Sequence, residues 1–155
     1  MTSTTLTPSP TLAARCAALH SRMEGFPLGV VQLAMRIGVG SVFFKAGLLK
    51  ASGFATAVML FENEYQVPLL APEVAARIAM VQELALPVLL FLGLGTRLAA
   101  LPLLGMIGVI QLFVYPGAWT EHLIWSSILV FLMVRGAGPL SLDALIARRW
   151  LRDTT

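Results

Sequence analysis

Four long runs of mostly apolar residues restrict the folds open to this chain. They lie at about 28–49, 74–95, 98–115 and 119–136. Each comes close to the ~20 residues that an α-helix needs to cross a bilayer, the fourth only when it is counted over its full extent. Charged residues make up only 12% of the 155 residues, against about 25% in soluble globular domains. The sequence therefore predicts an all-α integral membrane protein in which four spanning helices form a bundle.

The segments outside these runs have the pattern of helices that lie along a membrane surface. Residues 1–27 are predicted to be a disordered arm followed by a short amphipathic helix. Between the first two runs, residues 52–73 repeat apolar side chains at helical spacing. Residues 137–155 contain a last amphipathic helix, which begins after Ser141. The chain is thus expected to divide into two interfacial segments, 1–27 and 137–155, around a membrane domain at 28–136.

Basic and acidic residues separate to the two ends of the predicted spans. Arginines precede the first span, lie between the second and third, and follow the fourth, whereas glutamates occupy the connection after the first span. By the positive-inside rule, this asymmetry places both termini in the cytoplasm and the 52–73 connection outside. The arginines are Arg15, Arg22, Arg97, Arg135, Arg148, Arg149 and Arg152, and the glutamates are Glu62, Glu64 and Glu73.

Two of the ionisable residues in the apolar runs lie far from the ends of their spans, where an unpaired charge costs about 2.5–3.5 kcal/mol. They are Arg36 in the first span and Glu83 in the second. Counting about 1.5 Å of rise per residue from the span ends places both near mid-membrane, roughly one helical turn apart. Arg36 shares a helical face with Lys50, while Lys45 points to the opposite side. We therefore predict a buried Arg36–Glu83 pair, which serves either the packing of the bundle or a polar site.

A second group of polar residues comes to the outer ends of the spans. We predict that Lys50, Gln111, Tyr115 and His122 surround the mouth of a site whose interior the buried pair lines. His122 suits a hydrogen bond to a quinone or a proton relay. Tyr115, with the nearby tryptophans, equally fits an ordinary interfacial belt of aromatic residues.

A metal site is a weaker interpretation of the same region. Glu62, Glu64, Glu121 and His122 offer carboxylate and imidazole ligands at the outer face. The single cysteine, Cys16, excludes a cysteine-based cluster. The sequence contains no nucleotide-binding loop and no catalytic serine motif, and nothing in it indicates a nucleic-acid partner.

Several short motifs, in order, resemble the DoxX family. The run RIGVGSVFFKAGLLK at 36–50 is similar to the family's first-span signature. Further similarity is carried by EYQVPLL with Pro72, by Glu83 with LGLGTRLAA, by VYPGAW with His122 and Trp125, and by GPLSLD. The resemblance covers about 30–150. It implies a small four-helix protein of the bacterial inner membrane, and it associates the chain with redox complexes such as a thiosulfate:quinone oxidoreductase, with oxidative-stress assemblies and with gene clusters for metal-binding peptides.

Two functions of different classes follow from the residues and the resemblance together. The first is a membrane subunit of a quinone-linked redox or stress-response complex, in which a partner or a bound quinone supplies the redox centre. The alternative is a non-enzymatic scaffold or transport component of a metal-response system, and a purely structural bundle is a third reading. The expected partners are the lipid bilayer and other protein subunits. Catalysis by this chain and a homo-oligomeric state stay open at the level of the sequence.

Overall fold

The computed structural model describes residues 11–153, apart from the side chains at 14, 18, 19, 22–24 and 151–153. Helices alone make up its regular structure within that range, which confirms the all-α prediction. The α-helices are α1 (Leu12–Glu24), α2 (Leu28–Ser52), α3 (Phe54–Leu60), α4 (Pro72–Leu92), α5 (Thr96–Val109), α6 (Trp119–Arg135) and α7 (Leu142–Asp153), and the π-helical turns are η1 (Phe61–Tyr65) and η2 (Ile110–Val114). The predicted disordered arm at 1–10 lies outside the described residues.

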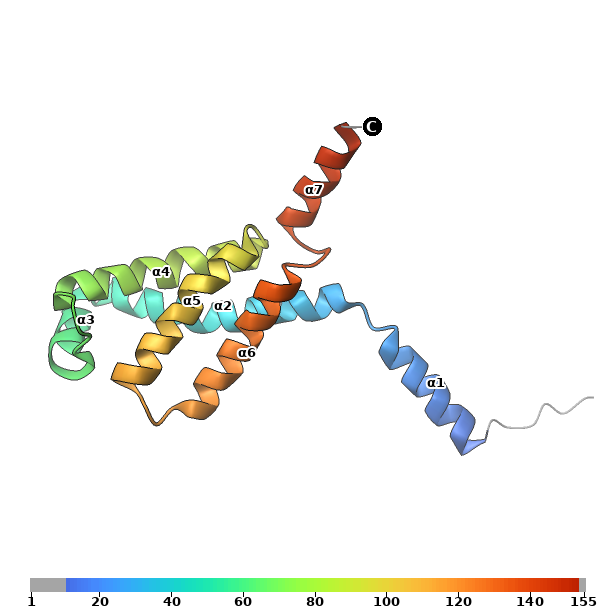
Figure 1. Ribbon diagram of the computed structural model, residues 1–155, viewed down its shortest axis with the longest axis horizontal. Helices are drawn as coiled ribbons and strands as arrows, with labels where there is room; N and C mark the ends of the chain where they lie inside the picture. The colour runs from blue at the N-terminus through green and yellow to red at the C-terminus, as the bar shows by residue number, and fades with distance from the viewer. Residues whose placement is uncertain (1–10, 154–155) are drawn as a thin grey trace, which may run out of the picture.

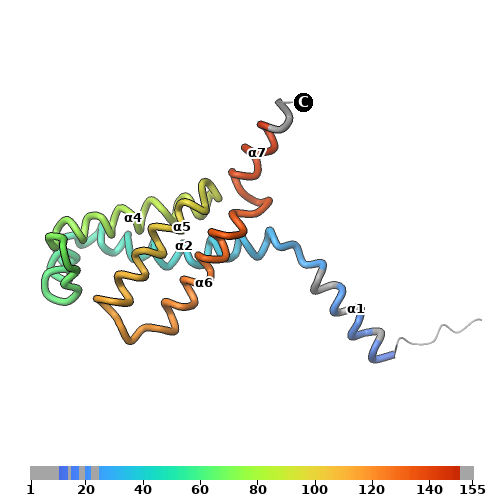
Figure 2. Tube along the Cα trace, in the orientation of Figure 1, coloured from blue at the N-terminus to red at the C-terminus, as the bar shows by residue number. Residues whose placement is uncertain are grey.

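Four helices form the body of the molecule. α2 and α4 run side by side in opposite directions, and α5 and α6 form a second antiparallel pair that packs against them (Figure 1). α3 and η1 cover one end of the α2–α4 pair. α1 and α7 extend away from the body at the other end, as the chain trace in Figure 2 also shows. Helices therefore occur in all three segments that the sequence assigns to the membrane interface.

Three of these helices are long and apolar enough to cross a membrane. α2 has 25 residues, α4 has 21, and α5 continues through η2 to give 19. The chain is thus a multi-pass membrane protein with three candidate spans among the described residues. α6, with 17 residues, is not among these three candidates, so the predicted bundle of four spanning helices is not confirmed.

The boundaries of α4 follow from two residues with special backbone properties. Pro72 is the first residue of the helix, a position at which the backbone N–H makes no hydrogen bond within the helix, so that proline loses nothing there. Gly93 ends it in the left-handed conformation, with φ at 66°, a conformation that suits glycine because it has no Cβ. α4 therefore begins two residues before the second predicted span, 74–95, and ends three residues before it does.

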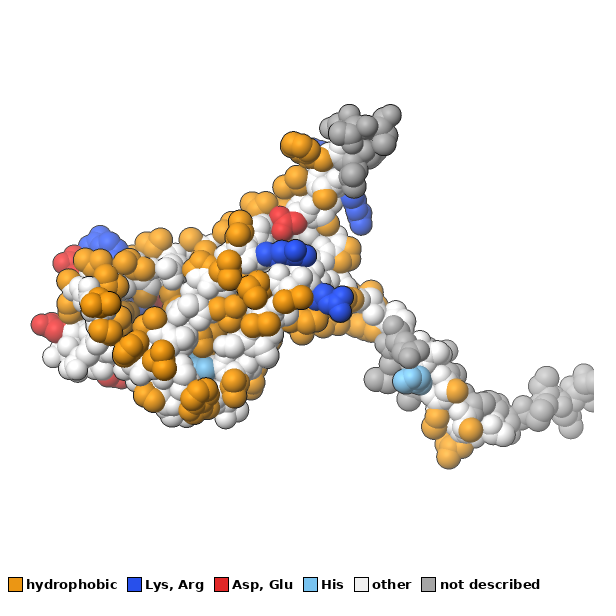
Figure 3. Space-filling model, in the orientation of Figure 1, with side chains coloured by type: hydrophobic (Ala, Val, Ile, Leu, Met, Phe, Trp, Pro, Cys, Tyr) orange, Lys and Arg blue, Asp and Glu red, His pale blue; other side chains and the backbone are white. Residues whose placement is uncertain are grey.

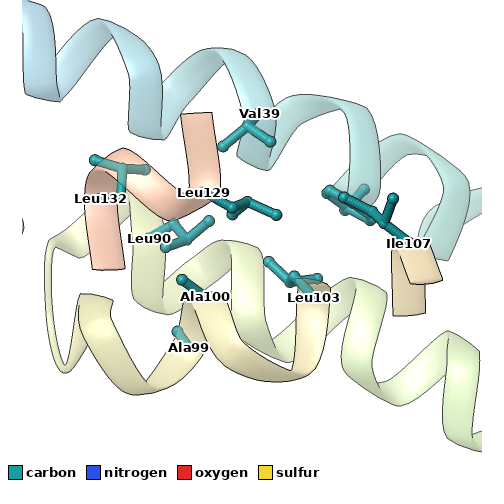
Figure 4. Packing of buried hydrophobic residues seen from close by; sticks show 9 residues of the cluster. Val39, Leu90, Ala99, Ala100, Leu103, Ile107, Leu129 and Leu132 are labelled. Carbon is teal, nitrogen blue, oxygen red and sulfur yellow. The ribbon is translucent and has the colours of Figure 1, made fainter. Parts of the chain in front are cut away.

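All four helices of the body contribute to one apolar core (Figure 4). Leu90, Leu103, Leu129 and Leu132 are fully buried there, and they come from α4, α5 and α6. The outer surface is also apolar: Figure 3 shows hydrophobic side chains over much of the visible face, while charged side chains gather towards the two ends of the body. Helices that are apolar on both the inner and the outer side are typical of proteins that have lipid as their solvent.

Glycine residues allow α2 and α4 to approach closely. A Cβ atom on Gly47 would lie 2.9 Å from both the carbonyl carbon and the Cβ of Glu83. A Cβ on Gly40 would meet the Phe91 ring at 2.6 Å. Small residues at such seams let the backbones of membrane helices come into contact. Gly47 therefore sets the level at which α4 crosses α2.

We expect Gly47→Ala to lower the free energy of unfolding by about 1–3 kcal/mol, the usual cost of adding a methyl group where no space exists. The matched control is Gly38→Ala on the same helix, where a Cβ would have no neighbour within 4 Å. Thermal unfolding of both variants in a mild detergent measures the difference. Equal melting temperatures for the two variants would contradict the close contact at Gly47.

Candidate functional site

A cavity of about 1040 Å³ lies between α2, α4, α5 and α6, at the end of the body that α3 and η1 cover. Most of the side chains around it are apolar. The polar and charged residues in its lining are Lys50, Tyr65, Gln82, Glu83, Tyr115, Glu121, His122 and Trp125. Four of the predicted site residues thus meet at one cavity: Glu83, Lys50, Tyr115 and His122. Gln111 reaches it indirectly, through His122.

An ion pair between Lys50 and Glu83 forms part of the cavity wall. The Lys50 ammonium donates hydrogen bonds to both carboxylate oxygens of Glu83, with Nζ 2.9 Å from Oε1 and 2.7 Å from Oε2. The Glu83 side chain is 5% exposed and the Lys50 side chain 18%. Because the two charges neutralise each other, the wall is polar but carries no net charge at this point.

The predicted Arg36–Glu83 pair is wrong, although both residues are buried as expected. The guanidinium of Arg36 instead donates hydrogen bonds to three backbone carbonyls. Its Nη1 lies 3.1 Å from Leu90 O and 3.3 Å from Phe91 O, and its Nη2 lies 2.5 Å from Leu140 O. Arg36 therefore joins α2 to the end of α4 and to the segment before α7, and it does not line the cavity.

The physical reason is the relative position of α2 and α4 along their axes. Gly47 packs on Glu83, and Arg36 precedes Gly47 by eleven residues, or about 16 Å of helix. Lys50 follows Gly47 by less than one turn, so its side chain reaches the carboxylate. Counting from the ends of the spans assumed that α2 and α4 end at the same level. In the structure, α2 extends about two turns beyond Gly93, and residues 136–140 pack against this extension through Gln32 and Gly29.

A buried histidine of α6, His122, lines the same cavity as Lys50 and Glu83. His122 is 5% exposed, and its Nδ1 lies 2.5 Å from Gln111 Oε1. Gln111 Nε2 donates to Pro116 O at 2.7 Å, which fixes the orientation of the amide. The oxygen facing His122 can only accept, so Nδ1 carries the proton and Nε2 of the neutral ring has a free lone pair. Among the described residues, Nε2 has no hydrogen-bond partner.

Two π-helical turns border the cavity on its outer side. η1 and η2 lie next to each other, and both contribute residues to the lining. Their contact is made by aromatic rings: the Tyr65 and Tyr115 ring centroids are 5.8 Å apart, and the Tyr115 hydroxyl donates to Glu64 Oε1 at 2.9 Å. The Tyr65 hydroxyl and the Glu64 carboxylate raise the pKa of the Tyr115 phenol above its usual value. Single π-helical turns are frequent at functional sites.

The four metal candidates do not come together as one group, although Glu121 and His122 both line the large cavity. Glu62 and Glu121 are exposed, Glu64 accepts the Tyr115 hydroxyl, and His122 is held by Gln111. Among residues 11–153, no group of three or more histidine, cysteine, aspartate or glutamate side chains is placed to hold a metal ion.

Sequence reasoning overlooked two parts of the site. The first is Lys50 as the partner of Glu83, although its position on the Arg36 face of α2 was a usable signal. The second is the pair of π-helical turns, because neither Phe61–Tyr65 nor Ile110–Val114 has a residue pattern that distinguishes it from an ordinary helix. Tyr65 lies in the 52–73 connection and in the motif EYQVPLL, but it was not among the predicted site residues.

The comparisons with known proteins agree with this architecture. The profile of the DoxX family matches residues 31–116, which is more than half of the chain and includes most of α2 together with α4, η1 and η2. An uncharacterized protein of Haemophilus influenzae is 31% identical over 147 residues, and the match covers 84% of this chain and 96% of that protein. No solved structure gives a significant match. The chain belongs to the DoxX family.

Proposed function

We propose that this protein is a membrane subunit of a quinone-linked redox or stress-response complex and that its large cavity binds a quinone. The observation that supports this proposal most directly is an apolar cavity whose wall contains two polar groups, Lys50 Nζ and His122 Nε2, that can each make a further hydrogen bond. Lys50 Nζ has three N–H donors, of which Glu83 takes two. His122 Nε2 is an unused acceptor. A quinone has the matching chemistry, because it combines a large apolar ring and tail with oxygens at opposite edges of the ring.

The groups in the wall suit both oxidation states of such a ligand. The remaining N–H of Lys50 can donate to a quinone carbonyl, and His122 Nε2 can accept from a hydroquinone hydroxyl. The cavity, at about 1040 Å³, lies at the upper end of the roughly 300–1,000 Å³ typical of small-molecule sites. Redox chemistry is supplied by the quinone and by a partner subunit, while this chain binds and orients the ring.

As such a subunit the protein has four spans, with α6 as the fourth. Its 17 residues match the lower limit of about 17 residues for a membrane helix. Leu129 and Leu132 of α6 are fully buried in the common core. Four spans put both termini on the same side, and the arginines near the ends of the chain favour the cytoplasm for that side.

Trp125 offers a direct test because it lines the cavity and its ring centroid is 5.7 Å from that of His122. In a Trp119→Phe/Trp150→Phe background it is the only tryptophan. We expect a short-tailed quinone to quench its fluorescence saturably. The double variant Lys50→Met/Glu83→Gln, which removes both charges together, should weaken binding about tenfold, as the loss of one hydrogen bond to a charged donor predicts.

The matched control for this test is Lys45→Met/Glu73→Gln, which changes the same residue types on the same two helices at exposed positions. Its quinone affinity should equal that of the starting protein. Quinone should also be extracted by organic solvent from protein purified in gentle detergent. Linear, unsaturable quenching together with quinone-free extracts would overturn the proposal and favour the non-enzymatic scaffold.

A further inference from the structure

A second, smaller cavity lies at the opposite end of α5 and α6 from the first. Its volume is about 380 Å³, and it is formed where α5 begins, α6 ends and α7 begins. Arg97, Leu98, Gly136 and Asp143 are among the residues that line it. The quinone proposal does not involve this cavity, and no residue is shared between the two linings.

Arg97 lines this cavity as an exposed residue whose guanidinium has no partner among the described residues. It lies over the backbone of Gly136: a Cβ on Gly136 would be 3.3 Å from Arg97 Nε and 3.7 Å from Nη2. Gly136 has φ at 77°, so side chains rarely occupy this position and the approach stays open. Among the described residues, Arg97 makes no hydrogen bond and no ion pair. Because the carbonyls of the last turn of α6 do not bind it, Arg97 does not simply cap that helix.

The acidic residue in the lining is already engaged elsewhere. Asp143 Oδ1 accepts the backbone N–H of Gly95 at 2.9 Å, and its own N–H donates to Gly93 O at 3.0 Å. The buried cation of Arg36 interacts electrostatically with the same carboxylate. Asp143 therefore fastens α7 to the turn between α4 and α5, and Arg36 offsets its charge, so that Arg97 remains available to an anion.

The surroundings of the cavity are both basic and apolar. Arg135, Arg148 and Arg149 are exposed at this end of the molecule, and Figure 3 shows basic side chains around the base of α7. Leu98 lines the cavity and is 75% exposed, and Leu145 of α7 is 55% exposed. An anion that fits here is thus expected to carry a hydrocarbon part. Free inorganic anions lack it.

We infer that this cavity binds the phosphate of an anionic phospholipid headgroup. Arg97 donates to the phosphate oxygens, since the fork of a guanidinium matches the geometry of a phosphate. The acyl chains lie against Leu98 and the exposed leucine and isoleucine of α7. Basic pockets between membrane helices are suited to such headgroups. The site would hold α7 and the α4–α5 turn against one leaflet of the membrane.

Native mass spectrometry of the full chain in a neutral detergent tests the inference. The protein is titrated with phosphatidylglycerol, with phosphatidylcholine and, separately, with inorganic phosphate as competitor. We expect one phosphatidylglycerol to bind more tightly than phosphatidylcholine and to resist inorganic phosphate. Arg97→Met should weaken the binding about tenfold, the effect of losing a charge-assisted contact. Ala144→Leu, which fills the cavity without altering charge, should weaken it to a similar degree.

The matched control is Arg148→Met, which removes an arginine of the same end from outside the cavity and should change affinity by less than about twofold. Thermal unfolding of each variant shows whether it is still folded, so that weaker lipid binding by a folded variant can be assigned to loss of the site. Equal weakening by Arg97→Met and Arg148→Met would show a diffuse attraction to the basic surface and would overturn the inference. Displacement of the lipid by millimolar inorganic phosphate would overturn it as well, because a free anion would then be the ligand.

Discussion

Replacing Glu83 by glutamine should destabilise the protein by about 3 kcal/mol, because the change leaves the Lys50 ammonium without its partner in a largely apolar environment. Both carboxylate oxygens accept from Lys50, so the substitution removes the charge and one of the two strong acceptors at once. The free energy of unfolding can be followed by tryptophan fluorescence during titration with sodium dodecyl sulfate.

A second substitution distinguishes the true partner of Glu83 from the alternative. Lys50→Met should restore most of the stability that Glu83→Gln removes, because replacing a whole buried pair is close to neutral. Arg36→Met should restore none of it and should add its own loss. If the Arg36 variant rescued Glu83→Gln and the Lys50 variant did not, the Lys50–Glu83 pair would be wrong.

Arg36→Met should cost at least about 4.5 kcal/mol, since hydrogen bonds from a charged donor contribute roughly 1.5–3 kcal/mol each and Arg36 makes three of them to carbonyls of two segments. Arg36→Lys should recover less than half of that loss, because an ammonium keeps the charge but lacks the fork that reaches all three carbonyls. Thermal unfolding in detergent gives the ranking of the three proteins.

The control for Arg36 is Arg77→Met on α4. The Arg77 side chain is 61% exposed and pairs with Glu73 of the same helix, so its loss should cost less than about 1 kcal/mol. Full stability of Arg36→Met, or equal stability of the lysine variant and the native protein, would show that the carbonyl contacts contribute little to the fold.

The sequence was enough to predict which residues of α2 point into the bundle. It was not enough to predict the position of α2 along its axis relative to α4. Helical periodicity placed Arg36 and Lys50 on one face and Lys45 on the other, and the structure has Arg36 buried and Lys45 exposed. The level depends on which atoms touch, and here it is set by the absence of a side chain at Gly47 against Glu83. No count along a single helix contains that information, so the predicted partner of Glu83, Arg36, lies about four turns from the true partner, Lys50.

The cavity combines predictable and unpredictable parts in the same way. Lys50, Tyr115 and His122 were expected near one another because all three were predicted to lie at the outer ends of their spans, and they line one cavity. The role of Gln111 in orienting His122 depends on η2, where the helix widens by one residue per turn. The Tyr65–Tyr115 contact depends on η1 in the same manner. Local propensities differ too little between α- and π-helical turns for a sequence to show either.

The three carbonyls around Arg36 also have a consequence for biosynthesis. Leu140, which supplies one of them, follows Arg36 by 104 residues, and a chain leaves the ribosome from its N-terminus. The first long helix must therefore enter the membrane while its cation still lacks its last acceptor, and it stays in that condition until Leu140 has been translated. A nascent chain that is released before Leu140 has been made therefore leaves the buried Arg36 with one of its three acceptors missing.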